Sequence, residues 1–500
     1  MGEMKAFLKR ESVYINLILM VFFAVFARFW EPGLGNSATG YGSLARNLSE
    51  DWNWFHLHLA PHFFNPFVDH PPLIIWLDAL VFKLFGASAQ TIRLLSSIAA
   101  LGIFSALFFT VRRYFDERAA LFSVFSLITV NVFMNYTSSG WLDMPMIGLV
   151  WAGTYFGFRG LQENKERLLF LAGVSLGFSV LAKGVCALAL FPVAFFIGIK
   201  RLEKREYFSF FMFNFSILMP VLLFTWGHYN SAHFLFWIKY WQREALEQTL
   251  NNPQSLSILD YLWYVKKAFQ FGHLVTILGL VSCVTLWRFE KRDWALLVLS
   301  EFLIHSLGYS WCTRHYSQYV IPIFPWLALG SGILLAKGFK KFQTLTISKV
   351  GLALGILFFT VVDIFPIRVH SGNENPFRGL MSTMRQIKDN KNMYFVGSME
   401  DQSTWEDPAS YIVWYAGRNP IIGSFDEILE NLGRRDPQAL AVISTGYLSK
   451  NAAALSRYPN VTKCIFNDQI TILSQTSLCP DEVKSWRYRE EPKSTYEKAP

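Results

Sequence analysis

The stretch RLLFLAGVSLGFSVLAKGVCALALFPVAFFIGIKR (residues 167–201) decides the fold class. It contains two apolar runs, residues 168–182 and 184–199, with one charged residue, Lys183, between them. Each run approaches the length of about 20 mostly apolar residues that a membrane-crossing helix needs. Arginines stand at both ends of the stretch. The pattern therefore predicts two spans joined by a tight turn, which places a lysine at the membrane boundary.

The composition of the whole chain agrees with a membrane protein. Of the 500 residues, 52% are hydrophobic and 17% are charged, whereas a soluble domain would have about a quarter of its residues charged. The net charge of +9 lies in short basic clusters between apolar runs. Such clusters indicate membrane topology rather than a nucleic-acid-binding surface. We therefore predict an integral membrane protein in contact with lipid, with no nucleic-acid partner.

Apolar runs along the chain predict about 11 spans. They lie near residues 13–30, 90–111, 119–136, 144–159, 168–182, 184–199, 208–228, 269–287, 294–310, 319–336 and 351–366. If the N-terminus is cytoplasmic, every second connection carries Lys or Arg, from Arg112 and Arg113 to Lys340 and Lys341, as the positive-inside rule requires. An odd number of spans places the C-terminal tail outside the cytoplasm. The first span has no small-residue cleavage site after it and is predicted to be an uncleaved helix.

Two long connections lie on the predicted outer side, at residues 31–90 and 229–268. Both are rich in Trp, Phe and His, so they are too amphipathic for free loops. Residues 72–85 predict a helix lying in the membrane interface. These connections therefore form part of the predicted transmembrane domain, residues 1–367.

The chain changes character after about residue 368, where short β-type runs alternate with helical ones. We predict a soluble α/β domain at residues 368–480 and a charged, disordered tail at residues 481–500. Cys464 and Cys479 lie in this region, and a disulfide between them is reasonable outside the cytoplasm. The predicted fold class is an all-α polytopic transmembrane bundle with a C-terminal soluble α/β domain.

Several ionisable residues gather at the predicted outer face, where such residues are usually functional. They are Asp69, His70, Asp143, Lys183, Arg243 and Arg314. A carboxylate can act as a base or ligate a divalent cation, while Lys, Arg and His can hold a phosphate. Asp69 and Asp143 are thus the candidate catalytic residues and the candidate metal ligands.

Each of these residues also has a purely structural interpretation. Asp143 could cap the helix that follows it, and Lys183 could extend to a lipid headgroup. Arg243 and Arg314 could contact anionic lipid. Their convergence on one face favours function over these separate explanations.

Motifs in a fixed order carry a family resemblance. They are YGSLARNL at residues 41–48, VDHPPLIIWLDALVFKLFG at 68–86, LDMP at 142–145, LAKGVCALALFPV at 181–193 and RHYSQYVIPIFPWLALG at 314–330. Together they resemble the GT-C superfamily of polyprenyl-phosphate-sugar glycosyltransferases, over roughly residues 10–340. The branch most similar to the chain holds the lipid A aminoarabinose transferases and the protein O-mannosyltransferases.

The resemblance implies transfer of a sugar from a polyprenyl phosphate to a hydroxyl or phosphate of lipid A, another glycolipid or a protein. It implies Asp69 and Asp143 as catalytic carboxylates. It assigns the donor phosphate and lipid to His70, Lys183, Arg243, Arg314 and Tyr319. No nucleotide cofactor is implied, and the sequence has neither a P-loop nor a dinucleotide fingerprint. The membrane implied is a bacterial inner membrane, with the C-terminal domain in the periplasm.

The sequence departs from the family pattern at three positions. Ser37 stands where the family usually has an acidic residue, and His70 replaces a lysine of the aminoarabinose transferases. Tyr240 stands where those enzymes have a metal-binding histidine. Two alternatives therefore remain open: a catalytically silent relative that binds lipid-linked sugar, and a lipid or sugar transporter. A transporter would more often show an inverted repeat and charges buried at mid-membrane.

Overall fold

The structure is a computed structural model. The residues that it describes are 2–27, 29–30, 34, 36–59, 67–230, 236–240, 242, 262–288, 291–308, 316–364, 393–396, 421–423, 425–435, 439–444, 448–449, 451–465 and 470–474. The chain divides into two compact units. The first comprises Met1–Pro32, Val68–Val81 and Ser88–Val369, and the second comprises Gly33–Phe67, Phe82–Ala87 and His370–Pro500.

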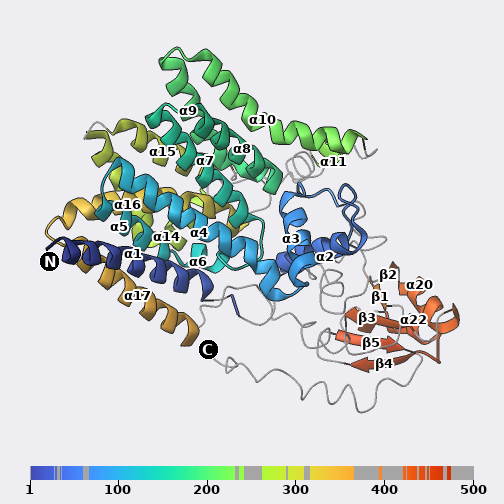
Figure 1. The fold of residues 1–500 in the computed structure, drawn as a ribbon. Helices are drawn as coiled ribbons and strands as arrows, with labels where there is room; N and C mark the ends of the chain where they lie inside the picture. Colours follow the sequence, from blue (N-terminus) through green and yellow to red (C-terminus); the bar gives the residue numbers. More distant parts are fainter. Residues whose placement is uncertain are drawn as a thin grey trace. The chain divides into compact units, whose positions relative to one another are not determined.

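The first unit is a bundle of helices (Figure 1). Its helices are α1 (Gly2–Phe26), α3 (Leu73–Phe85, whose last residues fall in the second unit), α4 (Ala89–Tyr114), α5 (Glu117–Ile128), α6 (Asn131–Tyr136), α7 (Asp143–Glu163), α8 (Glu166–Lys183), η1 (Gly184–Ala189), α9 (Leu190–Glu203), α10 (Tyr207–Asn230), α11 (Phe236–Tyr240), α14 (Trp263–Arg288), α15 (Arg292–Leu303), η3 (Ile304–Gly308), η5 (Ser317–Ile323), α16 (Phe324–Gly338) and α17 (Thr344–Ile364).

Small residues allow the central helices to pack closely. Helix α7 lies between α4 and α8, and α8 also packs against α10. Gly153 of α7 faces α8, where an added Cβ would lie 2.8 Å from the Leu176 side chain, and Gly157 faces Ile197 of α9. Gly177 of α8 likewise faces the backbone of α10. Membrane helices commonly associate through such small residues, because lipid gives no hydrophobic drive for helix association.

Each predicted span overlaps a helix or two consecutive helices. Four described helices are by themselves long and apolar enough to cross a membrane: Ala89–Tyr114, Tyr207–Asn230, Trp263–Arg288 and Gln318–Gly338. The other predicted spans coincide with shorter or interrupted helices; for example, the span predicted at 119–136 is divided into α5 and α6. The polytopic bundle is confirmed in this coarse form, while the number of spans stays a prediction.

The second unit contains α2 (Asn36–Asp51) and a five-stranded mixed sheet of order β2-β1-β3-β5-β4 (Figure 1). The strands are β1 (Met393–Val396), β2 (Ile421–Gly423), β3 (Leu440–Ser444), β4 (Thr462–Ile465) and β5 (Ile470–Ser474). Strand β1 pairs in parallel with β2 and β3, while β5 pairs antiparallel with β3 and β4. Helix α20 (Phe425–Glu430) packs Phe425, Ile428 and Leu429 into the core with Ala441, Ile443 and Leu473 of the sheet.

The sequence predicted strands at 393–396, 440–444 and 469–473, and the structure has β1, β3 and β5 there. The domain limits at 368 and 480 stay predictions. Residues 481–500 lie outside the described residues, as does Cys479, so the disulfide with Cys464 is also untested.

Candidate functional site

The site begins at the turn between α8 and η1. Helix α8 ends at Lys183, and Gly184 follows with φ +64° and ψ −132°. Residues with a Cβ rarely adopt this backbone region, so glycine is the residue that fits here. A Cβ at Gly184 would also overlap the hydroxyl of Tyr240. The Lys-Gly pair predicted as a turn thus places the lysine at a sharp, tightly packed change of direction.

The Lys183 ammonium group forms a buried ion pair with the Asp143 carboxylate. Nζ of Lys183 contacts Oδ1 of Asp143, and both side chains are 3% exposed. Asp143 is the first residue of α7, so two helix ends 40 residues apart supply the two charges. Removing one partner of a buried pair typically costs about 3–5 kcal/mol, because the other charge is then left alone.

Tyrosine side chains lie beside this ion pair, beginning with Tyr319 of η5. Lys183 Nζ lies 5.2 Å from the centroid of the Tyr319 ring, within cation–π range. Tyr264 and Tyr316 surround Tyr319, with ring centroids 6.5 and 5.8 Å from it. The Tyr264 hydroxyl accepts a hydrogen bond of 3.1 Å from the Tyr316 backbone N–H. The Lys183 ammonium therefore has a carboxylate and an aromatic ring as neighbours.

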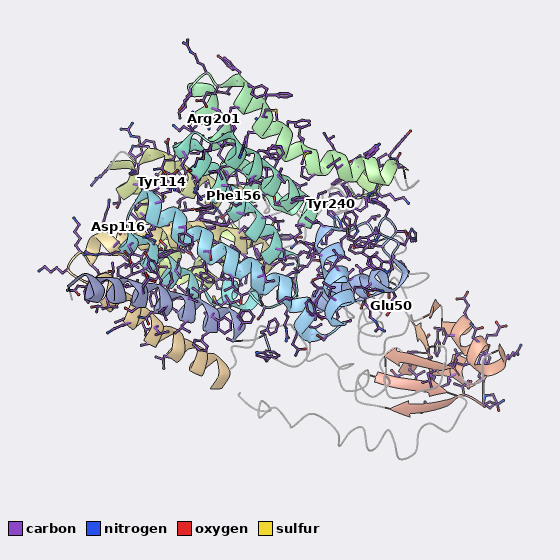
Figure 2. The ribbon with its side chains drawn as sticks, in the orientation of Figure 1. Glu50, Tyr114, Asp116, Phe156, Arg201 and Tyr240 are labelled. Carbon is purple, nitrogen blue, oxygen red and sulfur yellow. The ribbon has the colours of Figure 1, made fainter. Side chains whose placement is uncertain are left out.

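An aromatic cluster closes the opposite side of the turn. Tyr240 stacks on Phe236 and packs with Val68 and Leu181 in one buried cluster. Figure 2 shows Tyr240 toward one end of the bundle, with Tyr114 and Asp116 toward the other end. Tyr240 therefore packs against the site but offers no imidazole for a metal.

The Asp69-His70 segment lies against the same turn. Val68 packs with Leu181, and Pro71 Cδ is 3.2 Å from the position that a Cβ of Gly184 would take. The Oδ1 atom of Asp69 and the Nδ1 atom of His70 are shielded from solvent. The structure thus brings the segment of these two residues to the turn of Lys183. Arg243 and Arg314 lie outside the described residues.

The metal predicted on Asp69 and Asp143 stays a prediction. Among the described residues, no group of three or more His, Cys, Asp or Glu side chains could hold a metal ion. Asp143 already pairs with Lys183, and Tyr240 occupies the position of the expected histidine. In α2, Ser37 lies in a first turn without acidic residues. No chemical step is therefore assigned to a metal.

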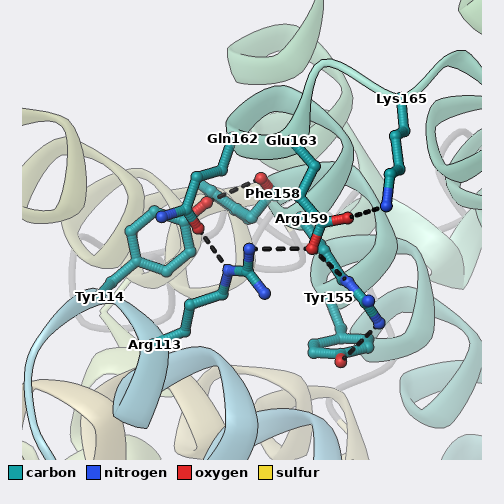
Figure 3. Close-up of polar contacts among 8 residues, drawn as sticks. All are labelled: Arg113, Tyr114, Tyr155, Phe158, Arg159, Gln162, Glu163 and Lys165. Atoms are coloured by element: carbon teal, nitrogen blue, oxygen red, sulfur yellow. Dashed lines mark hydrogen bonds and ion pairs between the residues drawn. The ribbon is translucent and has the colours of Figure 1, made fainter.

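A second charged cluster joins α4 and α7 at the other end of the bundle (Figure 3). Glu163 Oε1 accepts hydrogen bonds of 2.9 Å from Arg113 and 2.8 Å from Arg159. Lys165 Nζ lies 2.8 Å from Glu163 Oε2. The hydrogen bonds with Lys165 and Arg159 lower the pKa of Glu163 to about 2. This cluster lies on the predicted cytoplasmic side, away from the Lys183 turn, and it ties two helices together.

Sequence reasoning missed several buried ionisable residues, among them Asp78, Glu301 and His305. Asp78 of α3 is 2% exposed, and Glu301 and His305 of the α15–η3 segment are fully buried. All three stand inside apolar runs, VDHPPLIIWLDALVF and WALLVLSEFLIHSL. An ionisable residue in such a run is a signal for a functional site, so the sequence contained the evidence.

Comparisons with known proteins find related sequences and a related fold. Residues 69–225, which include Asp69, Asp143 and Lys183, match a family described as dolichyl-phosphate-mannose-protein mannosyltransferase. The chain is 24% identical over 343 residues to the undecaprenyl phosphate-alpha-4-amino-4-deoxy-L-arabinose arabinosyl transferase of Shewanella sediminis, covering 65% of this chain and 59% of that protein. The transferase of the same description from Pectobacterium carotovorum is 23% identical, with 60% and 54% covered. The chain thus spans less than two thirds of the length of these two relatives.

The fold is shared with a solved structure of the same class. ArnT from Cupriavidus metallidurans, bound to undecaprenyl phosphate, superposes with a TM-score of 0.71 at 14% identity, covering 93% of this chain and 98% of that one. The chain therefore has the ArnT-type fold, and its long apolar helices agree with an integral membrane protein. Together, the matches confirm the predicted resemblance to the GT-C superfamily, in the branch of the aminoarabinose transferases and protein O-mannosyltransferases.

Proposed function

We propose that the chain is an integral-membrane glycosyltransferase that moves a sugar from a polyprenyl-phosphate carrier to an acceptor hydroxyl or phosphate. The observation that carries the proposal is the buried Lys183–Asp143 pair beside Tyr319. It lies in a fold for which one solved example has undecaprenyl phosphate bound. A cation for a leaving phosphate and a carboxylate for a proton are the two groups that such a transfer requires.

Lys183 would hold the donor phosphate. When the bond between the anomeric carbon and the phosphate oxygen breaks, that oxygen keeps the electron pair, and the phosphate gains negative charge. A fixed ammonium in a site without water stabilises this charge most effectively. Tyr319 supports the ammonium from its ring face. His70, Arg243 and Arg314 are proposed as further contacts to the phosphate and lipid.

Asp143 would accept the proton of the acceptor. An ammonium group has three donor hydrogens, so Lys183 can bind a phosphate oxygen while it still holds Asp143. The acceptor oxygen then attacks the anomeric carbon from the face opposite the phosphate, and the configuration at that carbon inverts. Asp69 is the second candidate base, because its segment lies at the same turn.

The proposal includes a topology and an acceptor. The basic connections would place the N-terminus in the cytoplasm. The site would then lie on the other face of a bacterial inner membrane, and about 11 spans would put the C-terminal domain on that face too. The domain at residues 368–480 would lie in the periplasm, where it could position a glycolipid or a protein acceptor. The basic connections predicted from the sequence support this orientation.

A reconstituted turnover assay tests the function. Purified full-length protein in lipid receives radiolabelled polyprenyl-phosphate sugars and membrane-extract acceptors, with and without a chelator. Wild-type protein should transfer label. Asp143→Asn should abolish transfer, because an amide cannot take a proton, and Asp69→Asn should reduce it. The matched control is Asp116→Asn, since Asp116 caps α5 with a 2.7 Å bond from Ala119 N, a role that asparagine can also fill.

The same assay separates the alternatives. Labelled donor that binds but is never consumed would identify a silent relative, in which Ser37 has replaced a required acid. Donor that changes leaflet without transfer would identify a transporter. Normal turnover of Asp143→Asn would remove Asp143 from the mechanism, and a loss of transfer with chelator would restore a metal on Asp69 or Asp143.

A further inference from the structure

Glu301 and His305 form a buried pair on the inward face of the segment made by α15 and η3. They stand one helical turn apart, Glu301 in α15 and His305 in the π-helical turn η3. Neither is exposed to any extent. The Nδ1 atom of His305 lies 2.9 Å from the Glu301 backbone carbonyl oxygen and 3.5 Å from its Oε2 atom. The imidazole is therefore held by the residue one turn before it.

Burying two ionisable side chains costs folding free energy. Ionisable side chains at membrane depth are expensive and are usually functional. Burying a polar or ionisable group costs free energy unless its new partners compensate for the lost hydration. Stability alone therefore gives a weak reason for a glutamate and a histidine inside the run LLVLSEFLIHSL.

The backbone is irregular at the same place. Residues Ile304–Gly308 form a π-helical turn that continues α15. A π turn widens the helix by one residue, and single π turns within α-helices occur frequently at functional sites. His305 lies inside this turn, so its imidazole and the altered backbone belong to one local structure.

The π turn contacts both segments that form the candidate site. Turn η3 packs against η1, which follows directly after Lys183, and against η5, which carries Tyr319. At Gly308, an added Cβ would meet Leu188 of η1 at 3.4 Å. The Glu301–His305 pair is thus one element away from Lys183 and from Tyr319.

We propose that Glu301 and His305 are a positioning pair for the donor-phosphate site. The pair fixes the π turn, and the π turn holds η1 and η5 at the spacing that places Lys183 beside Tyr319. The two residues act through these segments and do not touch the phosphate. This inference rests on the proposed function, and it adds two residues outside the motifs of the family resemblance.

Binding of undecaprenyl phosphate to the full-length protein in lipid nanodiscs provides the test, together with donor and acceptor KM. His305→Ala should weaken binding of undecaprenyl phosphate about tenfold or more, since displacements near 1 Å at a site can cost that much. Donor KM should rise, while acceptor KM should stay unchanged. His305→Asn should recover most of the affinity, because its amide N–H can replace the Nδ1 donor. Glu301→Gln combined with His305→Ala should add little to His305→Ala alone.

Thr154→Val is the matched control. Thr154 is also fully buried, and its hydroxyl bonds the Val150 carbonyl at 2.9 Å within α7. It should leave donor affinity unchanged. If His305→Ala behaves in the same way, the pair has only a structural role and the inference is wrong.

Binding and turnover also separate this inference from the proposed function. A wild-type protein that binds undecaprenyl phosphate but transfers nothing would contradict the enzyme, while the affinities of the variants would still decide on the pair. A wild-type protein that binds no undecaprenyl phosphate would overturn both.

Discussion

The ion pair between Lys183 and Asp143 decides how both residues are interpreted. A lone lysine at the end of a span usually extends toward lipid headgroups, but Lys183 is 3% exposed and ion-paired. An aspartate at the start of a helix usually caps it, but the residue in the N-cap position is Leu142, and no side chain caps α7. Both structural interpretations of the sequence are therefore wrong for this structure, and the pair remains as a candidate for chemistry.

Asp78 gives a prediction at the residue scale. It shares the buried face of α3 with Ile74 and Ile75, and burial raises its pKa well above the usual range. A carboxyl with a raised folded-state pKa favours folding at low pH. Wild-type stability should therefore fall as pH rises from about 4 through the folded-state pKa.

Asp78→Asn should not show this fall, because its amide does not ionise. We expect the variant to melt a few degrees above wild type at neutral pH and at the same temperature near pH 4. Melting curves of both proteins in detergent between pH 4 and 8 would measure the effect. Parallel curves across that range would contradict it.

At this scale, the sequence predicted individual groups but not their contacts. Lys183 and Asp143 were identified by type and by position near a membrane boundary, yet 40 residues separate them in the chain. Their contact depends on how α7 packs against α8, which side-chain type does not determine. Glu301 and His305 were missed because the apolar run around them was interpreted only as a span.

The bounds of the long helices follow the hydropathy of the sequence closely, whereas the irregular turns between them do not. Apolar runs predicted α4 and α10 within a few residues. The 3₁₀ turn η1, the π turn η3 and the break between α5 and α6 were not predicted. Hydropathy measures how apolar a segment is, whereas these irregularities depend on backbone hydrogen bonds and on local packing. Both η1 and η3 adjoin the candidate site, so the unpredicted part of the fold is the part closest to the chemistry.

Glu163 gives a prediction at the scale of two helices. It joins α4 to α7 by accepting hydrogen bonds from Arg113 and Arg159 (Figure 3). Because hydrogen bonds with Lys165 and Arg159 stabilise the ionised carboxylate, the pKa of Glu163 falls to about 2. A lowered folded-state pKa gives stability above the unfolded value, near 4.5, and that stability is lost as pH falls toward 2.

Glu163→Gln should therefore lower the melting temperature at pH 7, and the difference from wild type should shrink below pH 4.5. High salt should also reduce the difference, since the cluster is near the surface. The control is Glu203→Gln, which removes an exposed pair with Lys200 and should change little. A pH-independent difference would show that Glu163 acts by packing rather than by charge.

At the scale of the whole molecule, the strand order of the sheet could not be predicted from the sequence. Strands β1, β3 and β5 were predicted from short β-type runs, whereas β2 and β4 were not, and the order β2-β1-β3-β5-β4 mixes parallel and antiparallel pairs. Strand order depends on contacts between distant segments, which a local pattern does not specify. The helical bundle was easier to predict, because each span needs only its own apolar run.

Membrane orientation is the prediction that belongs to the whole molecule. The alternation of basic connections requires an N-terminus in the cytoplasm and a C-terminal sheet outside. Single cysteines introduced into a cysteine-free protein would test this with a membrane-impermeant maleimide on intact cells. Asn53→Cys and Asp426→Cys should be labelled from outside, and Lys204→Cys only after the membrane is opened; all three positions are exposed.

The pattern of labelling identifies the error if the prediction fails. If Asp426→Cys is protected together with Lys204→Cys while Asn53→Cys is labelled, the number of spans between Lys204 and the sheet is even rather than odd, and one apolar run does not cross. The site would then keep its face while the sheet lost its role near the acceptor. If Asn53→Cys is protected and Lys204→Cys is labelled, the whole bundle is inverted. Lys183 would then face the cytoplasm, and a donor in the outer leaflet could not reach it.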